Sequence, residues 1–83
     1  MSNESIIVKI ESIVKALGGR IDTLNARNIS LADLGLDSLK TMDLILSVEQ
    51  TFQIEIPDEK LNTQYLRSIT TIAALVEDLT TKR

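Results

Sequence analysis

The sequence lacks cysteine, histidine and tryptophan, and it has one proline, three glycines and two aromatic residues in 83 positions. Without cysteine and histidine, the chain cannot form disulfides, thiolate or imidazole metal sites, or the Ser-His and Cys-His pairs that activate a nucleophile. So few glycines cannot form the phosphate-binding loops of Rossmann or P-loop folds, and neither glycine pattern occurs. The sequence therefore predicts a small protein that catalyses no reaction by itself.

Long hydrophobic runs and a positive net charge are also missing. The longest apolar run, Ile72–Val76, is far too short to span a bilayer, and Met1-Ser2-Asn3-Glu4 is not the basic start of a secretory signal. A net charge of −3 argues against nucleic acid or an anionic membrane as the partner. A chain of this length forms one hydrophobic core. We therefore expect a single domain over residues 1–83, monomeric and cytoplasmic, where reducing conditions also fit the absence of cysteine.

The negative charge is concentrated in the middle of the chain. Residues 33–59 hold seven acidic residues and one basic residue, a net charge of −6, whereas the remainder carries a net charge of +3. Such a cluster either aids solubility or steers basic partners to a docking surface. The acids Asp33, Asp37, Asp58 and Glu59 are interpreted as a solvated surface, and no metal site is expected there.

Hydrophobic periodicity predicts an all-α fold. A first helix, capped at Ser2 or Asn3 and stopped by Gly18-Gly19, has one apolar face: Ile6, Ile7, Ile10, Ile13, Val14 and Leu17. A second helix is expected from about Ser38 to Phe52 with Asp37 as N-cap. A last helix, with Thr70 as its cap, carries Ile72, Leu75, Val76 and Leu79.

The connections between these helices are expected to be polar and irregular. Pro57–Leu66 has room only for short helical turns, and the best strand candidate, Phe52–Ile56, is ended by Pro57. Residues 18–35 form a long connection that apolar side chains can pin to the core: Ile21, Leu24, Ile29, Leu31 and Leu34. The predicted architecture is a small four-helix bundle, three main helices plus a short third helix, with a long loop between helices 1 and 2.

The second helix has two apolar faces. At about 100° per residue, one face gathers the side chains that best form a core stripe: Thr41, Leu44, Ile45, Val48 and Phe52. The opposite face carries Leu39, Met42 and Leu46, with the acids Asp43 and Glu49 at its margin. Both faces could be buried in a crowded bundle or a homodimer. An outward Met/Leu strip edged by acids favours a protein-binding surface.

At the head of this helix stands Leu34-Gly35-Leu36-Asp37-Ser38-Leu39. Gly35 allows a tight turn, and Asp37 can cap the helix by accepting a backbone N–H bond. Ser38 then lies in the first helical turn, facing solvent, with no base of its own to activate it. It can serve as an acceptor when a separate enzyme supplies the base. Taken alone, an Asp-Ser pair that opens a helix is usually only a cap.

With its surroundings, this motif resembles the phosphopantetheine-attachment region of acyl carrier proteins. The resemblance extends through Met42-Asp43-Leu44, residues 49–52, Ile54–Glu59 and the helix start at 68–72, and covers about residues 4–80. It implies that a phosphopantetheinyl transferase attaches 4′-phosphopantetheine from coenzyme A to Ser38, and that the arm carries cargo as a thioester. It also implies docking of loading ligases or transferases and of downstream synthase enzymes through Leu39, Met42, Asp43, Leu46 and Glu49. The cargo is expected to rest against apolar groups of helices 2 and 3.

Two departures from the fatty-acid carriers bear on the pathway. Lys40 follows Asp-Ser-Leu where those carriers usually have an acid, and residues 57–69 are longer, with Leu61–Arg67 inserted. The longer form resembles stand-alone carriers of polyketide, nonribosomal-peptide and amino-acid-activating pathways, which favours a specialised pathway. A fatty-acid carrier with a drifted loop and a D-alanyl carrier remain alternatives. From a different class, the alternative is an unmodified helical adaptor that binds through Leu39, Met42 and Leu46.

Overall fold

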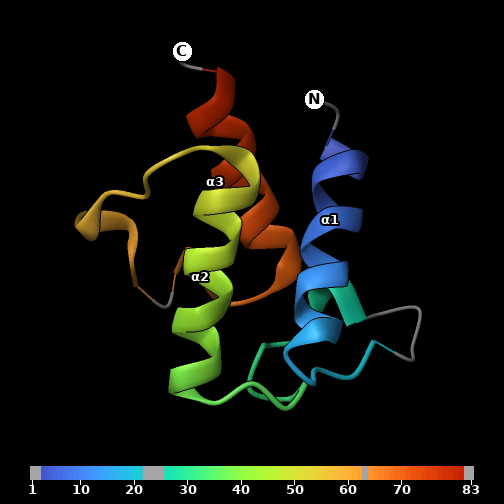
Figure 1. Ribbon diagram of the computed structural model, residues 1–83. Coiled ribbons are helices and arrows are strands. Elements are labelled where there is room, and N and C mark those ends of the chain that lie inside the picture. Colours follow the sequence, from blue (N-terminus) through green and yellow to red (C-terminus); the bar gives the residue numbers. More distant parts are fainter. Residues whose placement is uncertain (1–2, 22–25, 63, 82–83) are drawn as a thin grey trace.

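The computed structural model describes residues 3–21, 26–62 and 64–81 of the chain. Within them it has three α-helices and two 3-10 turns: α1 (Asn3–Ala16), η1 (Ala26–Asn28), α2 (Ser38–Phe52), η2 (Asp58–Lys60) and α3 (Ile69–Thr81). The first turn of α1 and the last turn of α3 lie at the same end of the bundle, and α2 runs opposite to α1 (Figure 1). The described part contains no strand, so the predicted all-α class is confirmed. None of its helices is long and apolar enough to cross a membrane.

Helix α1 begins at Asn3 and ends at the predicted glycine pair. Asn3 lies inside the helix, where its side-chain amide donates to Glu77 Oε2 on α3 at 2.8 Å; Ser2, the other proposed cap, is outside the described residues. At the C-terminal end Gly18 has φ +92°, its N–H donates to Lys15 O at 3.0 Å, and Gly19 N–H donates to Val14 O at 2.8 Å. This is a Schellman closure, which requires the left-handed conformation that glycine adopts without strain.

Helix α2 has the bounds that the sequence predicts. Asp37 is its N-cap, with an extended backbone and a side chain that accepts from Lys40 N. At the other end Gln53 takes the left-handed conformation, φ 55°, and the N–H groups of Gln53 and Ile54 both donate to Glu49 O. A left-handed residue other than glycine is uncommon. Here the paired hydrogen bonds hold it, and the chain leaves the helix in a fixed direction.

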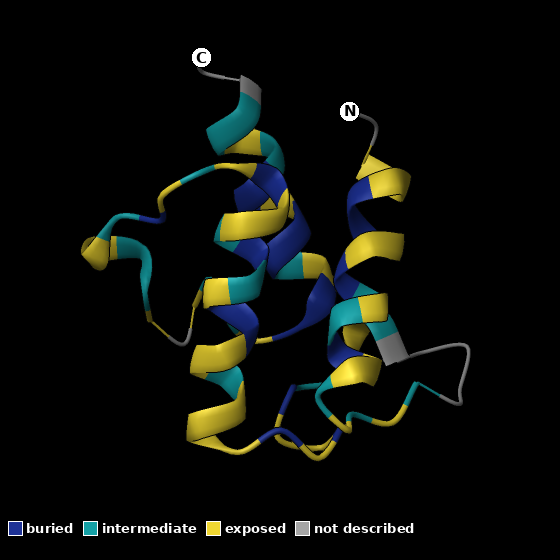
Figure 2. Ribbon diagram, viewed as in Figure 1, coloured by how far each residue is buried: buried dark blue, intermediate teal, exposed yellow. Residues whose placement is uncertain are grey.

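The core lies where the three α-helices meet. Each of them supplies three of the nine largest fully buried side chains: Ile6, Ile10, Val14; Leu44, Ile45, Val48; Ile69, Ile72, Val76. At roughly 1.5–3 kcal/mol for each buried aliphatic side chain, this cluster is the main source of stability. Figure 2 shows buried stretches on the sides of the helices that face one another, whereas much of the visible outer side of α2 is exposed.

The connection between α1 and α2 packs on the core and is bonded to α1 and α3. Leu31, Leu34 and Leu36 are buried, and Ile21 and Ile29 pack against the core as expected, whereas Leu24 lies outside the described residues.

In η1, the guanidinium of Arg27 forms ion pairs with Glu11 at 3.2 Å and with Glu4 at 3.0 Å. The hydrogen bonds of Arg27 to Glu11, which have the larger effect, and to Glu4 raise the pKa of Arg27 above its ordinary value. These ion pairs therefore hold the connection against α1 before the chain enters α2.

The predicted cap of the last helix is wrong by two residues. Ser68, which is buried, caps α3: Thr71 N–H donates to Ser68 Oγ at 3.3 Å, and Ser68 N–H donates to Thr71 Oγ1 at 3.0 Å. Thr70 already lies within α3, and its hydroxyl donates to Arg27 O at 2.8 Å. The helix starts earlier because the fully buried Ile69 belongs to the core and is its first residue.

Between α2 and α3, the described residues contain one helical element, the 3-10 turn η2. The short third helix, and with it the count of four helices, therefore stays a prediction. The long loop between α1 and α2 also stays one, because η1 lies within that connection. The chain after η2 is held by Asn62, whose amide donates to Glu59 O at 2.9 Å and whose Oδ1 accepts from Gln64 N at 3.0 Å.

Candidate functional site

A closed turn places Ser38 at the start of α2. Gly35, with φ +96°, donates from its N–H to Ala32 O at 3.0 Å, and Leu36 N–H donates to Leu31 O at 3.0 Å. Leu36 is 2% exposed and fixes the chain to the core two residues before the serine. The turn predicted at Gly35 is thereby confirmed, and it brings the polar residues that follow to the surface.

Asp37 and Ser38 differ in their hydrogen bonding at the start of α2. Asp37 Oδ1 accepts from Lys40 N at 2.9 Å, so its carboxylate is engaged with the helix backbone. Ser38 is the first residue of α2 and is exposed, and its hydroxyl forms no hydrogen bond or other contact of that kind within the described structure. The hydroxyl stands at the positive end of the helix dipole, where negative charge is stabilised. It is exposed to solvent at the first residue of the helix.

Lys40 follows Ser38 closely in sequence, but its ammonium group is directed toward α1. Lys40 Nζ lies next to Gly18, 3.5 Å from the position that the first side-chain atom of a larger residue would take there. The ammonium therefore sits at the C-terminal end of α1, where the helix dipole favours a cation. The positive charge of Lys40 therefore lies away from the strip of Leu39, Met42 and Leu46. It offsets the negative charge beside that strip less than the position of Lys40 in the sequence indicates.

A groove opens beside Ser38. It has a volume of about 610 Å³ and runs between the start of α2, the turn before it and the segment after η2. Apolar side chains form much of its lining: Leu31, Leu36, Met42, Leu61 and Leu66. Among the described residues that line it, Asp37 and Arg67 are the charged ones. An uncharged chain attached at Ser38 can therefore leave water and rest along this groove.

The outward strip on α2 is exposed as the sequence predicts. Leu39, Met42 and Leu46 are 78%, 48% and 54% exposed, and Asp43 beside them is exposed as well. The opposite face is buried at Leu44, Ile45, Val48 and Phe52, and Thr41 is half-buried. The division of this helix into a core face and a free face is confirmed. Its role in binding a partner stays a prediction.

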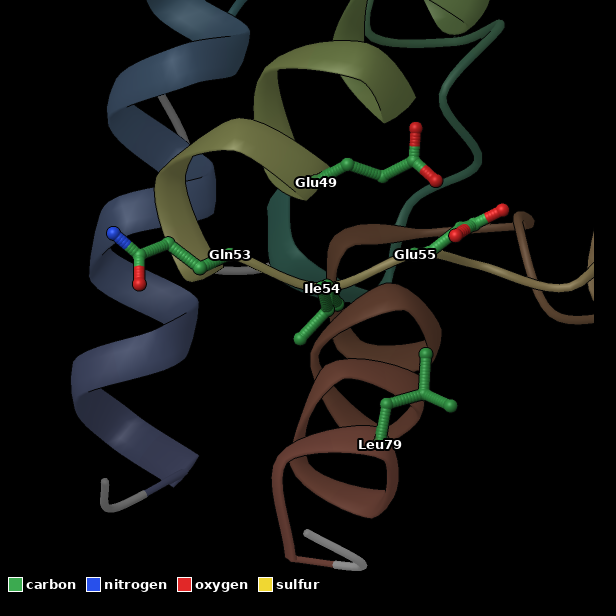
Figure 3. A pocket seen from close by; sticks show the side chains of 5 residues that line it. All are labelled: Glu49, Gln53, Ile54, Glu55 and Leu79. Carbon is green, nitrogen blue, oxygen red and sulfur yellow. The ribbon is translucent and has the colours of Figure 1, made fainter.

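Glu49 has a structural task that the sequence did not reveal. It is half-buried, and its Oε2 accepts from Ile56 N at 2.8 Å, which ties the end of α2 to the chain that follows. With Gln53, Ile54, Glu55 and Leu79 it lines a pocket of about 470 Å³, in which the carboxyl groups of Glu49 and Glu55 extend to the same side (Figure 3). Glu49 lies eleven residues after Ser38, roughly 16 Å along the helix, so this pocket is separate from the serine.

The sequence indicates apolar groups of the segment 57–66 as a resting place for cargo, but it singles out neither Leu61 nor Leu66, and it does not indicate Arg67. These residues lie in a segment without helical or strand periodicity, so their spacing does not indicate that they line a groove beside α2. Within the described residues, no group of three or more acidic side chains lies close enough together to hold a metal ion.

Comparison with known proteins agrees with this geometry. Residues 9–79 match the family model described as "Phosphopantetheine attachment site". An acyl carrier protein of Akkermansia muciniphila is 40% identical over 78 residues, which cover 93% of this chain and 95% of the relative.

The fold is also similar to a chain in the crystal structure of Bradyrhizobium japonicum glycine:[carrier protein] ligase complexed with glycylated carrier protein. The TM-score is 0.75 at 22% identity, covering 86% of this chain and 97% of that one. At this identity the likeness supports the fold alone.

The chain is a helical bundle with an exposed serine at the start of a helix, and residues 9–79 match the family model for phosphopantetheine attachment. It is therefore a phosphopantetheine-attachment domain. The chain belongs to the acyl carrier protein family, whose members are non-catalytic carriers with 4′-phosphopantetheine as prosthetic group.

Proposed function

We propose that Ser38 is the residue that bears the 4′-phosphopantetheine arm. The observation that carries the proposal is the exposed Ser38 hydroxyl, without a hydrogen bond to any described residue, at the mouth of a groove lined by apolar side chains. A phosphopantetheinyl transferase removes the hydroxyl proton, and Ser38 Oγ attacks the phosphorus that bears the pantetheine in coenzyme A. The bond from that phosphorus to the bridging oxygen breaks, and 3′,5′-ADP leaves. The arm supplies the thiol that the chain lacks, and acyl or aminoacyl cargo is then carried as a thioester.

Asp37 orients the acceptor. Because its carboxylate is bonded to Lys40 N, Asp37 fixes the first turn of α2 and hence the direction of the Ser38 side chain. It is a positioning residue.

Partner enzymes dock on the free face of α2. Leu39, Met42 and Leu46 supply apolar contact, and Asp43 adds charge at the margin. Glu49 belongs to the same surface, but its bond to Ile56 N limits its freedom to reach a partner. A loading ligase is proposed among these partners; the chain of similar fold was solved with a glycine:[carrier protein] ligase.

The pathway is proposed to be specialised, with an amino-acid-activating ligase as the loading enzyme. The groove-forming segment with Leu61 and Leu66 is the feature of this chain that supports the distinction from fatty-acid carriers. The fatty-acid and D-alanyl carriers remain the alternatives. Within this proposal, residues 1–83 act as one monomeric carrier domain in the cytoplasm.

Intact-mass spectrometry tests the attachment. After incubation with coenzyme A and a broad-specificity phosphopantetheinyl transferase, the wild-type chain is expected to gain the mass of one arm, and Ser38→Ala to gain none. Ser12→Ala, which alters an exposed serine on α1, is the matched control and is expected to gain the arm. No gain in the wild-type chain would favour the unmodified adaptor that uses the same exposed strip.

A further inference from the structure

Within the part of the chain that the structure describes, one cationic side chain lines the groove beside Ser38. Arg67 lines it together with Ser38 and is exposed. Within the described structure, its guanidinium forms no ion pair or hydrogen bond. Lys40, the cation nearest in sequence to Ser38, has its ammonium group at the end of α1 instead.

Two hydrogen bonds connect the backbone of Arg67 to the turn before Ser38. Leu31 N–H donates to Arg67 O at 3.0 Å, and Leu36 N–H donates to Leu31 O at 3.0 Å. Leu36 stands two residues before Ser38 and is buried. The base of the Arg67 side chain is therefore held at a fixed place across the groove from the serine.

The charges of the groove fit an anionic group on Ser38. A phosphodiester there carries one negative charge, and the carboxylate of Asp37 next to it opposes that charge. A guanidinium is the side chain that best pairs with phosphate, because it donates two parallel charge-assisted hydrogen bonds. Of the described residues lining the groove, Arg67 is the one that can supply them.

We propose that Arg67 pairs with the phosphodiester of the arm on Ser38 and holds the arm along the groove. The uncharged remainder of the arm then lies over Leu61 and Leu66. Arg67 is thus a positioning residue for the arm at rest. This inference rests on the proposed attachment at Ser38.

The test compares apo and holo forms of the wild type, Arg67→Gln, Arg67→Lys and Arg20→Gln. Arg20 is exposed and does not line the groove, which makes its variant the matched control. At low salt, the holo form of the wild type and of Arg20→Gln is expected to melt about 2–5 °C above the apo form. Arg67→Gln is expected to lose most of this difference and Arg67→Lys to keep part of it. Because a surface ion pair is screened, about 1 M salt is expected to reduce the wild-type difference as well.

Nuclear magnetic resonance gives a second reading, which follows the Arg67 side chain and the phosphorus of the arm separately. In the wild-type chain the Arg67 Nε–H resonance is expected to shift on conversion from apo to holo, and the Arg20 resonance to stay. The ³¹P resonance of the arm is expected to differ between the wild type and Arg67→Gln, and to be the same in Arg20→Gln. A chain that gains the arm but shows neither response refutes the role of Arg67 and leaves the carrier function intact. A chain that gains no arm refutes both.

Discussion

Asp37→Ala is the most informative single change at the site, because it removes the cap without altering the core. It deletes the 2.9 Å bond from Lys40 N to Asp37 Oδ1 and leaves that N–H exposed to water. Loss of a cap of this kind costs about 1 kcal/mol, within a range of about 0.5–2. For a domain of this size, 1 kcal/mol corresponds to a fall in Tm of roughly 4–8 °C.

Asp37→Asn separates the hydrogen bond from the charge. Its side-chain oxygen can still accept from Lys40 N, so we expect its stability to stay within about 0.5 kcal/mol of the wild type. Urea denaturation followed by circular dichroism measures both variants, and equal m-values show that the unfolded states are comparable. Asp37→Ala is also expected to slow arm transfer more than Asp37→Asn, because the first turn that orients Ser38 is loosened. Equal losses in stability for the two variants would refute the assignment of Asp37 as a cap.

Three further predictions concern the two faces and the end of α2. Met42→Glu is expected to change the free energy of unfolding by no more than about 0.5 kcal/mol, since Met42 is 48% exposed, while lowering turnover by a loading enzyme; loss of cooperative melting would place Met42 in the core. Leu44→Glu puts a charge at a fully buried position and is expected to abolish cooperative melting, and a stable variant would contradict the assigned core face. Glu49→Ala breaks the bond to Ile56 N and is expected to cost about 1–3 kcal/mol in urea denaturation, and Glu49→Gln less; no loss in Glu49→Ala would show that the bond is not formed.

Helix α2 could be predicted closely because several local signals agree there. The cap at Asp37, the turn at Gly35 and the two apolar faces all follow from residue type and spacing, and the structure has the same bounds and the same exposed strip. At the start of α3 the signals compete, since Ser68 and Thr70 are both good caps. Burial of Ile69 decides between them, and burial is a property of the tertiary structure.

The groove shows where prediction from sequence ends. Leu61 and Leu66 have no helical or strand periodicity, and hydrogen bonds of Asn62 to nearby backbone shape the segment that carries them. Whether that segment contacts α2 depends on long-range packing. The direction of Lys40 is likewise set by the neighbouring end of α1, which no local pattern around Ser38 indicates.

Attachment of the arm at Ser38 can be measured directly by tandem mass spectrometry of the tryptic peptide spanning residues 28–40, taken from protein purified from its native host. This peptide contains two serines, Ser30 and Ser38, and both line the same groove. We predict that fragmentation places the phosphopantetheine arm on Ser38 and leaves Ser30 unmodified. An arm on Ser30, or a peptide without any arm, would contradict the assignment of Ser38 as the attachment residue.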